Sequence, residues 1–359
     1  MCEHRICAVL ITDISAAPDA GYFFDMYKRG LLAVALLSWL WACTQSVRQP
    51  TPYVFAAPLP LGDTVPQPPH NRATVEGVAL GKMLFFDKRL SANQQLSCAS
   101  CHQVEKSFSD TAALTSRGVS GRPLLRHAQA LINLAWSENL FWDGGVRNLE
   151  SLTFSPLRHP DEMGADLQEL ITRLQALPEY RRAFRAAFGT DSITAALISR
   201  ALAQYQRTLI AANSRYDRYR RGEIQFNSLE LEGMAVFEQH CARCHTPPLF
   251  TDGKFHRNGL PLPAAIDSAG VLLGRQRITL QPSDFGKYKT PTLRNIMLTA
   301  PYMHDGSLPD MAAVMAHYSN LPDSVAQANG LPDGRFRHAN QRTLTAFLQT
   351  LTDSSLMVH

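Results

Sequence analysis

The sequence predicts an all-α fold made of two related domains with long loops. Three observations favour it. Apolar residues recur at helical spacing through the middle of the chain, alternating strand patterns are absent, and one short cysteine–histidine motif occurs twice after similar apolar lead-ins. At 359 residues the chain is long enough for two domains of ordinary size.

The amino-terminal part is expected to lie outside the folded core. Lys28 and Arg29 precede an apolar run that ends in "LWAC" at Cys43, the layout of a secretory signal closed by a bacterial lipobox. We therefore expect export to the periplasm with a lipid on Cys43; a plain cleaved signal is the alternative. Residues 1–43 form this leader, and the proline-rich stretch 44–70 is expected to be an extended tether.

Three stretches between the two motifs have the pattern of amphipathic helices with recognisable ends. They are "DLQELITRLQAL", which ends before Pro178, "EYRRAFRAAFG", which stops at Gly189, and "DSITAALISRALAQYQRTLIAA", which begins at a capping Asp191 or Ser192.

A charged segment, "RYDRYRRGEIQFN", follows these helices and indicates a domain boundary near residues 220–228. We place an N-terminal domain at 71–222 and a C-terminal domain at 223–353. The net charge is only +4, and the Lys and Arg residues are scattered along the chain. This pattern argues against nucleic acid as a partner.

Two Cys-x-x-Cys-His motifs carry the chemistry. Haem attachment uses two thiols that add to vinyl groups and a histidine that binds iron, and this spacing places all three on one helical turn. A zinc site would need both motifs to meet at one ion, and a thioredoxin-like pair would need a βαβ pattern. The motifs therefore predict two covalently bound c-type haems, with anchors Cys98, Cys101, Cys241 and Cys244 and proximal ligands His102 and His245.

The chain resembles the bacterial dihaem cytochrome c peroxidase family, which includes the MauG-type enzymes. The resemblance extends from about Gly77 to about Leu348 and depends on "LSCASCH", "FWDGGVRNLE", "PDEMG", "CARCHTPPLFTDGKF", "KTPTLRNIMLTAPYMHDGSL" and "VMAHY". It implies that the N-terminal haem meets hydrogen peroxide and that the C-terminal haem handles electron transfer.

The resemblance assigns catalytic roles to two residues. Trp142 takes the place of the tryptophan between the haems, where an indole can carry electrons from one centre to the other. Glu162 takes the place of the distal glutamate, which moves a proton while the O–O bond breaks. From the residues alone, Trp142 could be a core aromatic and Glu162 a surface or capping residue.

The loop that supplies a distal histidine in many family members has none here. Its counterpart, Gly118 to Ser120, lacks one, and His127 stands further along. We therefore expect a peroxidatic haem that is open to peroxide without reductive activation, as in the MauG-type branch. His127 as a distal ligand is the alternative.

The resemblance places the distal ligand of the second haem at Tyr318, as in MauG-type members, where classical peroxidases have methionine. A phenolate is an anionic donor that favours ferric iron. Met311, Met315 and Tyr318 are spaced to share one helix face, so Met315 is the alternative ligand.

Two positions depart from the family pattern. Leu152 replaces a frequent glutamine, so Glu162 would lack a polar companion. A calcium ion would lie at the backbone carbonyls of Thr299 and Pro301, but His127 replaces its asparagine ligand, and calcium prefers oxygen. Calcium binding is therefore left open.

We expect a periplasmic peroxidase that takes electrons from a small redox protein, either a cytochrome c or a cupredoxin. Two alternatives are kept: a MauG-like oxidase that acts on a side chain of a partner protein, and a non-catalytic dihaem electron-transfer cytochrome. Contact with the membrane would be only through the N-terminal lipid, and a homodimer is left open.

Overall fold

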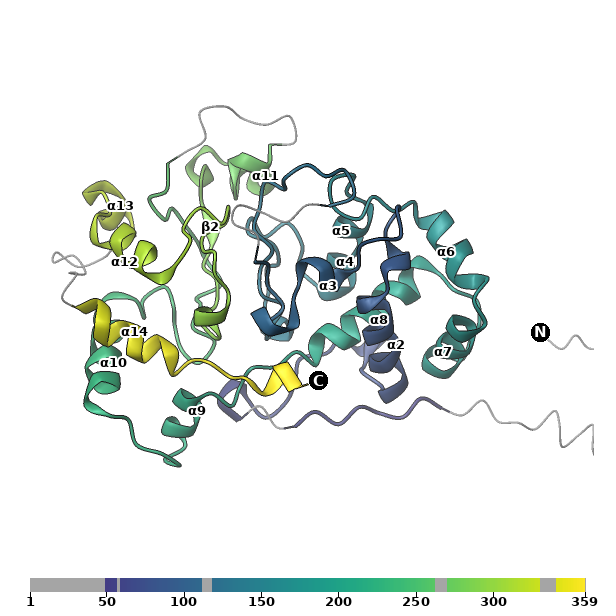
Figure 1. The fold of residues 1–359 in the computed structure, drawn as a ribbon, viewed down its shortest axis with the longest axis horizontal. Helices are drawn as coiled ribbons and strands as arrows, with labels where there is room; N and C mark the ends of the chain where they lie inside the picture. The colour runs from purple at the N-terminus through teal and green to yellow at the C-terminus, as the bar shows by residue number, and fades with distance from the viewer. Residues whose placement is uncertain (1–48, 57–58, 112–117, 262–269, 330–339, 359) are drawn as a thin grey trace, which may run out of the picture. The chain divides into compact units, whose positions relative to one another are not determined.

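The computed structural model describes residues 49–56, 59–111, 118–261, 270–329 and 340–358 (Figure 1). The predicted signal segment and Cys43 lie outside these ranges. The described chain is rich in helices, which confirms the all-α prediction. The helices are α2 (Val75–Phe86), α3 (Cys98–Cys101), α4 (Leu149–Leu152), α5 (Phe154–Arg158), α6 (Leu167–Gln175), α7 (Pro178–Phe188), α8 (Ala195–Arg207), α9 (Arg215–Arg220), α10 (Ser228–His240), α11 (Gln276–Thr279), α12 (Met311–Ser319), α13 (Asp323–Ala328) and α14 (Gln341–Gln349).

A small strand pair, which the sequence did not predict, accompanies these helices. β1 (Phe255–His256) and β2 (Tyr288–Lys289) run antiparallel, with Phe255 opposite Lys289. Each strand has only two residues, too few for an alternating polar and apolar pattern to be recognised in the sequence.

The lead-in helices α2 and α10 pack in the same way, each through a glycine. A Cβ on Gly81 would lie 2.0 Å from the Ala201 carbonyl oxygen of α8, and one on Gly233 would lie 1.9 Å from the Thr343 carbonyl oxygen. Four residues after each glycine comes a fully buried phenylalanine, Phe85 or Phe237. The motif repeat is therefore also a repeat of helix packing.

The predicted helices are present, but the start of α8 differs from the prediction. Its N-cap is Thr194, whose hydroxyl oxygen accepts a hydrogen bond from the Leu197 N–H, so capping by Asp191 or Ser192 is wrong. The backbone before the cap is instead held by Gln175, which bonds the Asp191 carbonyl and the Ile193 N–H. Because of this tertiary contact, the helix begins two to three residues later than the local sequence suggests.

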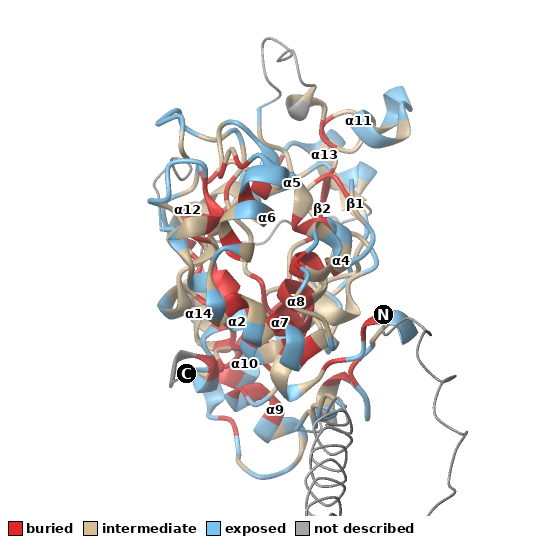
Figure 2. Cartoon of the chain, turned by 90° about the vertical axis from the view of Figure 1, so that its right-hand side faces the viewer, coloured by how far each residue is buried: buried red, intermediate tan, exposed pale blue. Residues whose placement is uncertain are grey.

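Two hydrophobic clusters surround the two motifs. One packs against Cys98 and the other against Cys241, and buried residues gather around α2, α8 and α10 (Figure 2). Residues from Pro50 onward nevertheless form one compact unit. The chain between α8 and α9 is held at Ala211, which bonds Asn133 and also accepts from Arg294. The two halves are therefore joined by buried polar contacts.

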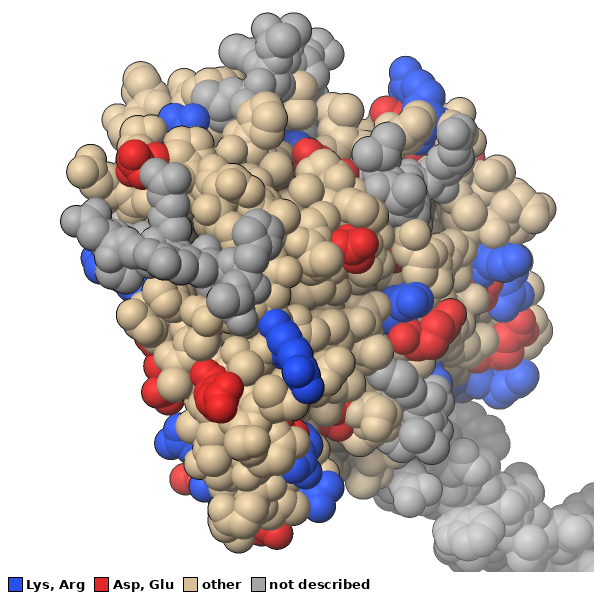
Figure 3. Space-filling model, turned by 60° about the vertical axis from the view of Figure 1, so that its left-hand side comes forward, with Lys and Arg blue, Asp and Glu red and all other residues tan. Residues whose placement is uncertain are grey.

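The described surface gives no continuous patch of one charge on the face in Figure 3, where blue and red side chains lie in small groups. Within the described ranges, every helix is too short or too polar to cross a bilayer. Thr51 and Tyr53, in the proline-rich stretch, contact the chain at the start of α2. The Thr51 N–H and hydroxyl donate to Glu76 of α2, and the Tyr53 N–H donates to the carbonyl of Ala73, just before this helix.

Candidate functional site

Both motif histidines are held through Nδ1 by backbone carbonyls. His102 Nδ1 lies 2.8 Å from the Phe108 oxygen, and His245 Nδ1 lies 3.2 Å from the Phe250 oxygen and 3.1 Å from that of Pro291. Phe108 and Phe250 both have left-handed backbone, with φ of 57° and 55°. Because a carbonyl can only accept, Nδ1 carries the proton and Nε2 is left unprotonated, as an iron ligand must be.

The four motif cysteines, Cys98, Cys101, Cys241 and Cys244, form no disulfide with one another. Burial raises the pKa of the Cys98 thiol to about 12, and burial likewise raises the pKa of Cys241 to about 12. A redox-active thiol needs the opposite shift, because the thiolate is the reactive form. The environment of these cysteines therefore argues against a thioredoxin-like pair.

A cavity of about 800 Å³ opens beside the second motif and can accommodate a cofactor of haem size. Cys241, Cys244, His245, Trp142 and Tyr318 are among its lining residues.

His304 also lines this cavity and supplies an unmatched polar atom. Its side chain is 8% exposed, and its Nδ1 is buried without a hydrogen-bond partner. Burial lowers the pKa of His304 to about 4, so the ring is neutral at pH 7. The thiols, the two oriented histidines and this unmatched nitrogen fit haem.

Trp142 and His304 occupy equivalent positions in the two halves. Each stands in a tight loop closed by a backbone bridge, Leu140 to Val146 around Trp142 and Tyr302 to Leu308 around His304. The residue before each has positive φ: 62° at Phe141 and 73° at Met303. The sequence contains a sign of this equivalence, because Trp142 and His304 are each followed by Asp-Gly, in "WDG" and "HDG". This shared pattern was not used in predicting the site.

His127 lies between these two loops. Its carbonyl oxygen accepts a 2.8 Å hydrogen bond from Trp142 Nε1, and its N–H donates a 2.9 Å bond to the His304 carbonyl. Its ring Nε2 lies 3.3 Å from the Asp110 carbonyl oxygen. The imidazole of His127 is therefore buried against backbone in this arrangement.

Glu162 lies on a turn that contacts the histidine-free loop. Its carbonyl accepts a 2.7 Å hydrogen bond from the Val119 N–H, and a Cβ on Gly118 would lie 1.8 Å from the Asp161 carbonyl oxygen. Met163, the next residue, belongs to the hydrophobic cluster that packs against Cys98. Burial raises the pKa of the Glu162 carboxyl, so this group keeps a proton more readily than an exposed glutamate.

Both candidate distal ligands of the second motif lie on α12 and line the cavity. Met315 is buried at 4% exposure, whereas Tyr318 is 37% exposed. Burial among protein atoms is nevertheless the main cause that raises the pKa of Tyr318, with Cys241 and Cys244 as further causes. The 37% exposed fraction of Tyr318 and its burial-raised pKa are consistent with each other if the exposed part of the ring faces the cavity. The choice between Tyr318 and Met315 stays a prediction.

The remaining predicted positions fall in two places. Leu152 packs in a hydrophobic cluster with Leu140 and Leu149. Thr299 and Pro301 line the cavity together with His127. Calcium at these carbonyls was left open from the sequence, and His127 stands where its asparagine ligand would be.

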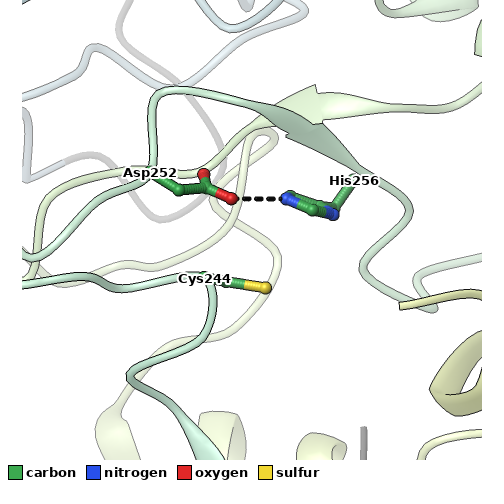
Figure 4. Close-up of side chains that lie close together, drawn as sticks. All are labelled: Cys244, Asp252 and His256. Atoms are coloured by element: carbon green, nitrogen blue, oxygen red, sulfur yellow. Dashed lines mark hydrogen bonds and ion pairs between the residues drawn. The ribbon is translucent and has the colours of Figure 1, made fainter. Parts of the chain in front are cut away.

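A polar cluster that the sequence motifs did not indicate lies beside the second motif. Ligand atoms of Cys244, Asp252 and His256 lie within 4.8 Å of one another (Figure 4), and His256 Nε2 lies 2.8 Å from the Asp252 carboxylate. Hydrogen bonding to Cys244 and then to Asp252 raises the pKa of His256 to about 9. Such a trio could hold a metal ion, but a thioether at Cys244 would remove the thiolate ligand.

Comparisons with known proteins agree with this geometry. The sequence profile described as di-haem cytochrome c peroxidase matches residues 75–225. The methylamine utilization protein MauG of Methylophilus methylotrophus is 36% identical over 304 residues, 82% of this chain and 88% of that protein. The cytochrome c551 peroxidase of Nitrosomonas europaea is 32% identical over 303 residues, 83% of this chain and 86% of that protein.

One solved structure has a similar fold and a related sequence. It is described as a MauG-like protein associated with microbial copper homeostasis, with a TM-score of 0.73, 32% identity and coverage of 88% of this chain and 97% of that one. With both haem-binding motifs and these relatives, the chain belongs to the di-haem cytochrome c peroxidase family, which includes MauG.

Proposed function

We propose that this oxidoreductase is a peroxidase that reduces hydrogen peroxide at the first haem site, with Glu162 as the acid–base group. The observation that carries this proposal is a carboxyl of raised pKa on a turn held against a histidine-free loop. Cys98, Cys101 and His102 would hold one haem, and Cys241, Cys244 and His245 the other, through thioether bonds and iron coordination. When bound, haem supplies the iron at which peroxide is reduced and passes on electrons that come from an external cytochrome c or cupredoxin.

The chain's own residues handle protons and orientation. Reduction of peroxide to two waters consumes two protons and two electrons, and the O–O bond breaks only if the departing oxygen is protonated. Glu162 would take a proton from one peroxide oxygen and give it to the other. Trp142 would carry electrons between the two haem sites, and its Nε1 hydrogen bond to the His127 carbonyl fixes its ring. The Phe108 and Phe250 carbonyls hold the two histidines in the iron-binding tautomer.

A second function has support from Tyr318 and from the relatives. Tyr318 lines the cavity beside the second motif. The sequence identity of this chain to MauG of M. methylotrophus is 36%, higher than its 32% identity to the N. europaea peroxidase. In this alternative the electrons come from a side chain of a partner protein instead of a cytochrome c or cupredoxin.

Two measurements test these functions. The resting holoprotein should give a mixed high-spin and low-spin ferric spectrum, and peroxide should be consumed with reduced cytochrome c or cupredoxin. A wholly low-spin spectrum without peroxide reactivity would leave a non-catalytic electron-transfer cytochrome. Peroxide-dependent oxidation of a partner protein, with no turnover on small redox proteins, would favour the MauG-like function.

The cellular location is also part of the proposal. The segment ending at Cys43 would direct export to the periplasm and carry a lipid, leaving the described chain outside the bilayer. Fractionation and labelling with a radioactive fatty acid test this: label should be found on the wild type and be lost in Cys43→Ser.

A further inference from the structure

Lys289 on β2 is a buried cation without a carboxylate partner among the described residues. Its side chain is 9% exposed, and Nζ donates one hydrogen bond, 2.8 Å long, to the Asn139 carbonyl oxygen. An ammonium group has three N–H donors. No described Asp or Glu lies within ion-pair distance of it, so its charge is compensated by a single carbonyl dipole.

A buried charge of this kind is costly unless an anion accompanies it. Burial lowers the pKa of Lys289 to about 8, and this value still leaves the group mostly protonated at pH 7. The other buried cation of the cavity, Arg294, is already paired: its NH1 and NH2 lie 2.8 and 2.9 Å from the Asp217 carboxylate. Lys289 is therefore the buried cation of this lining that lacks an anion.

The place of Lys289 identifies the missing anion. Lys289 lines the cavity that also holds Cys241, Cys244 and His245. A haem carries two carboxylate side chains. A haem bound to Cys241, Cys244 and His245 would occupy this cavity and bring its carboxylates into it. We propose that Lys289 binds a carboxylate of the second haem; this inference rests on the proposed attachment of that haem.

Lys289 also ties this cavity to the loop that holds Trp142. Its N–H donates a 2.8 Å hydrogen bond to the Trp142 carbonyl oxygen, while its Nζ bonds Asn139, three residues earlier. A carboxylate held by the same side chain would join the second haem to this loop. Lys289 is thus a positioning residue: it fixes the cofactor relative to the tryptophan and supplies a positive charge beside it.

The test compares Lys289→Met, which removes the charge, with Lys289→Arg, which keeps it. Lys287→Met is the matched control, because Lys287 lies two positions earlier, is only partly buried and pairs with the Asp284 carboxylate. A nearby cation favours the reduced iron. Lys289→Met should therefore lower the midpoint potential of the second haem by at least about 59 mV, a tenfold shift in the one-electron equilibrium. Lys289→Arg should retain most of the wild-type potential.

Resonance Raman spectra add a direct readout, since the bending band of a haem carboxylate side chain responds to its hydrogen bonds. This band should shift in Lys289→Met and in Lys289→Arg, but not in Lys287→Met. If Lys289→Met does not accumulate, the band in Lys289→Arg decides the question. Two haems per chain with unchanged potential and band would overturn the role of Lys289. If mass spectrometry of the wild-type protein shows no haem attached at Cys241 and Cys244, this result would instead contradict the proposed function.

Discussion

Trp142 Nε1 donates a 2.8 Å hydrogen bond to the backbone carbonyl oxygen of His127, a residue with only 5% of its surface exposed. Trp142→Phe removes the donor and leaves a buried acceptor unmatched, so we expect a stability loss of about 1–3 kcal/mol. Phenylalanine is also much harder to oxidise than indole, so electron transfer between the haem sites should slow by about tenfold or more, a barrier increase of about 1.4 kcal/mol.

Trp136→Phe is the matched control, because Trp136 lines the same cavity. Single-turnover absorption spectroscopy after peroxide addition separates electron transfer from folding, which urea denaturation measures independently. Equal electron-transfer rates in Trp142→Phe and the wild type would remove Trp142 from the electron path.

Replacing Glu162 tests the acid–base role. Glu162→Gln keeps the size of the side chain but cannot accept a proton, so peroxide reduction should slow by about 10²-fold or more. The exposed Glu138, which lines the cavity beside the second motif, gives the control Glu138→Gln, with expected wild-type turnover. Stopped-flow measurement of peroxide decay gives the rates. If peroxide decays in Glu162→Gln at the wild-type rate, Glu162 is not the acid–base group of the reaction.

The raised pKa of Glu162 also predicts a pH dependence of stability. Burial makes the folded chain hold this proton more tightly than the unfolded chain, whose glutamates have a pKa of about 4.3. The group's contribution to stability is therefore complete below the unfolded pKa and is lost as pH rises through the raised folded pKa. Glu162→Gln should gain stability relative to the wild type at pH 7, and the gain should shrink toward pH 4. Denaturant unfolding at several pH values measures this difference; a gain that grows on acidification would show the opposite shift.

The sequence predicted the helical fold because its signals are local. Pro178 and Gly189 mark helix ends by their own backbone preferences, and Gly189 indeed has a φ of 73° at the end of α7. The predicted cap of α8, Asp191 or Ser192, was wrong because Gln175, which is distant in the sequence, holds the backbone before the observed cap Thr194.

The site was only partly predictable for the same physical reason. The motif spacing identifies the haem-binding residues, since a fixed chemical group imposes a fixed pattern. The contacts of Lys289 with Trp142 and Asn139 come from segments far apart in the chain. A lysine in "KYKTP" has no local mark of burial, so its missing anion is visible only in three dimensions.

Helix packing gives a prediction that does not depend on the cofactor. In an ordinary helix interior, Gly→Ala stabilises by about 0.5–1 kcal/mol. Gly81→Ala and Gly233→Ala should instead destabilise by about 1–3 kcal/mol, because the new Cβ would overlap backbone of the neighbouring helix. Urea unfolding measures both. Stabilisation in either variant would mean that the two helices separate more easily than their contact distances suggest.

The choice between Tyr318 and Met315 can be made with single substitutions. If the Tyr318 phenolate binds the second iron, Tyr318→Met replaces an anionic donor by a neutral one that favours ferrous iron. The midpoint potential of that haem should then rise by more than about 59 mV, a tenfold change in its equilibrium. Met315→Leu, which keeps an apolar side chain in the same cluster, should leave the potential near the wild-type value. Spectroelectrochemical titration resolves the two haems. A large shift in Met315→Leu with little change in Tyr318→Met would identify the thioether as the ligand, and it would move this protein's second site toward the methionine-ligated members of its family.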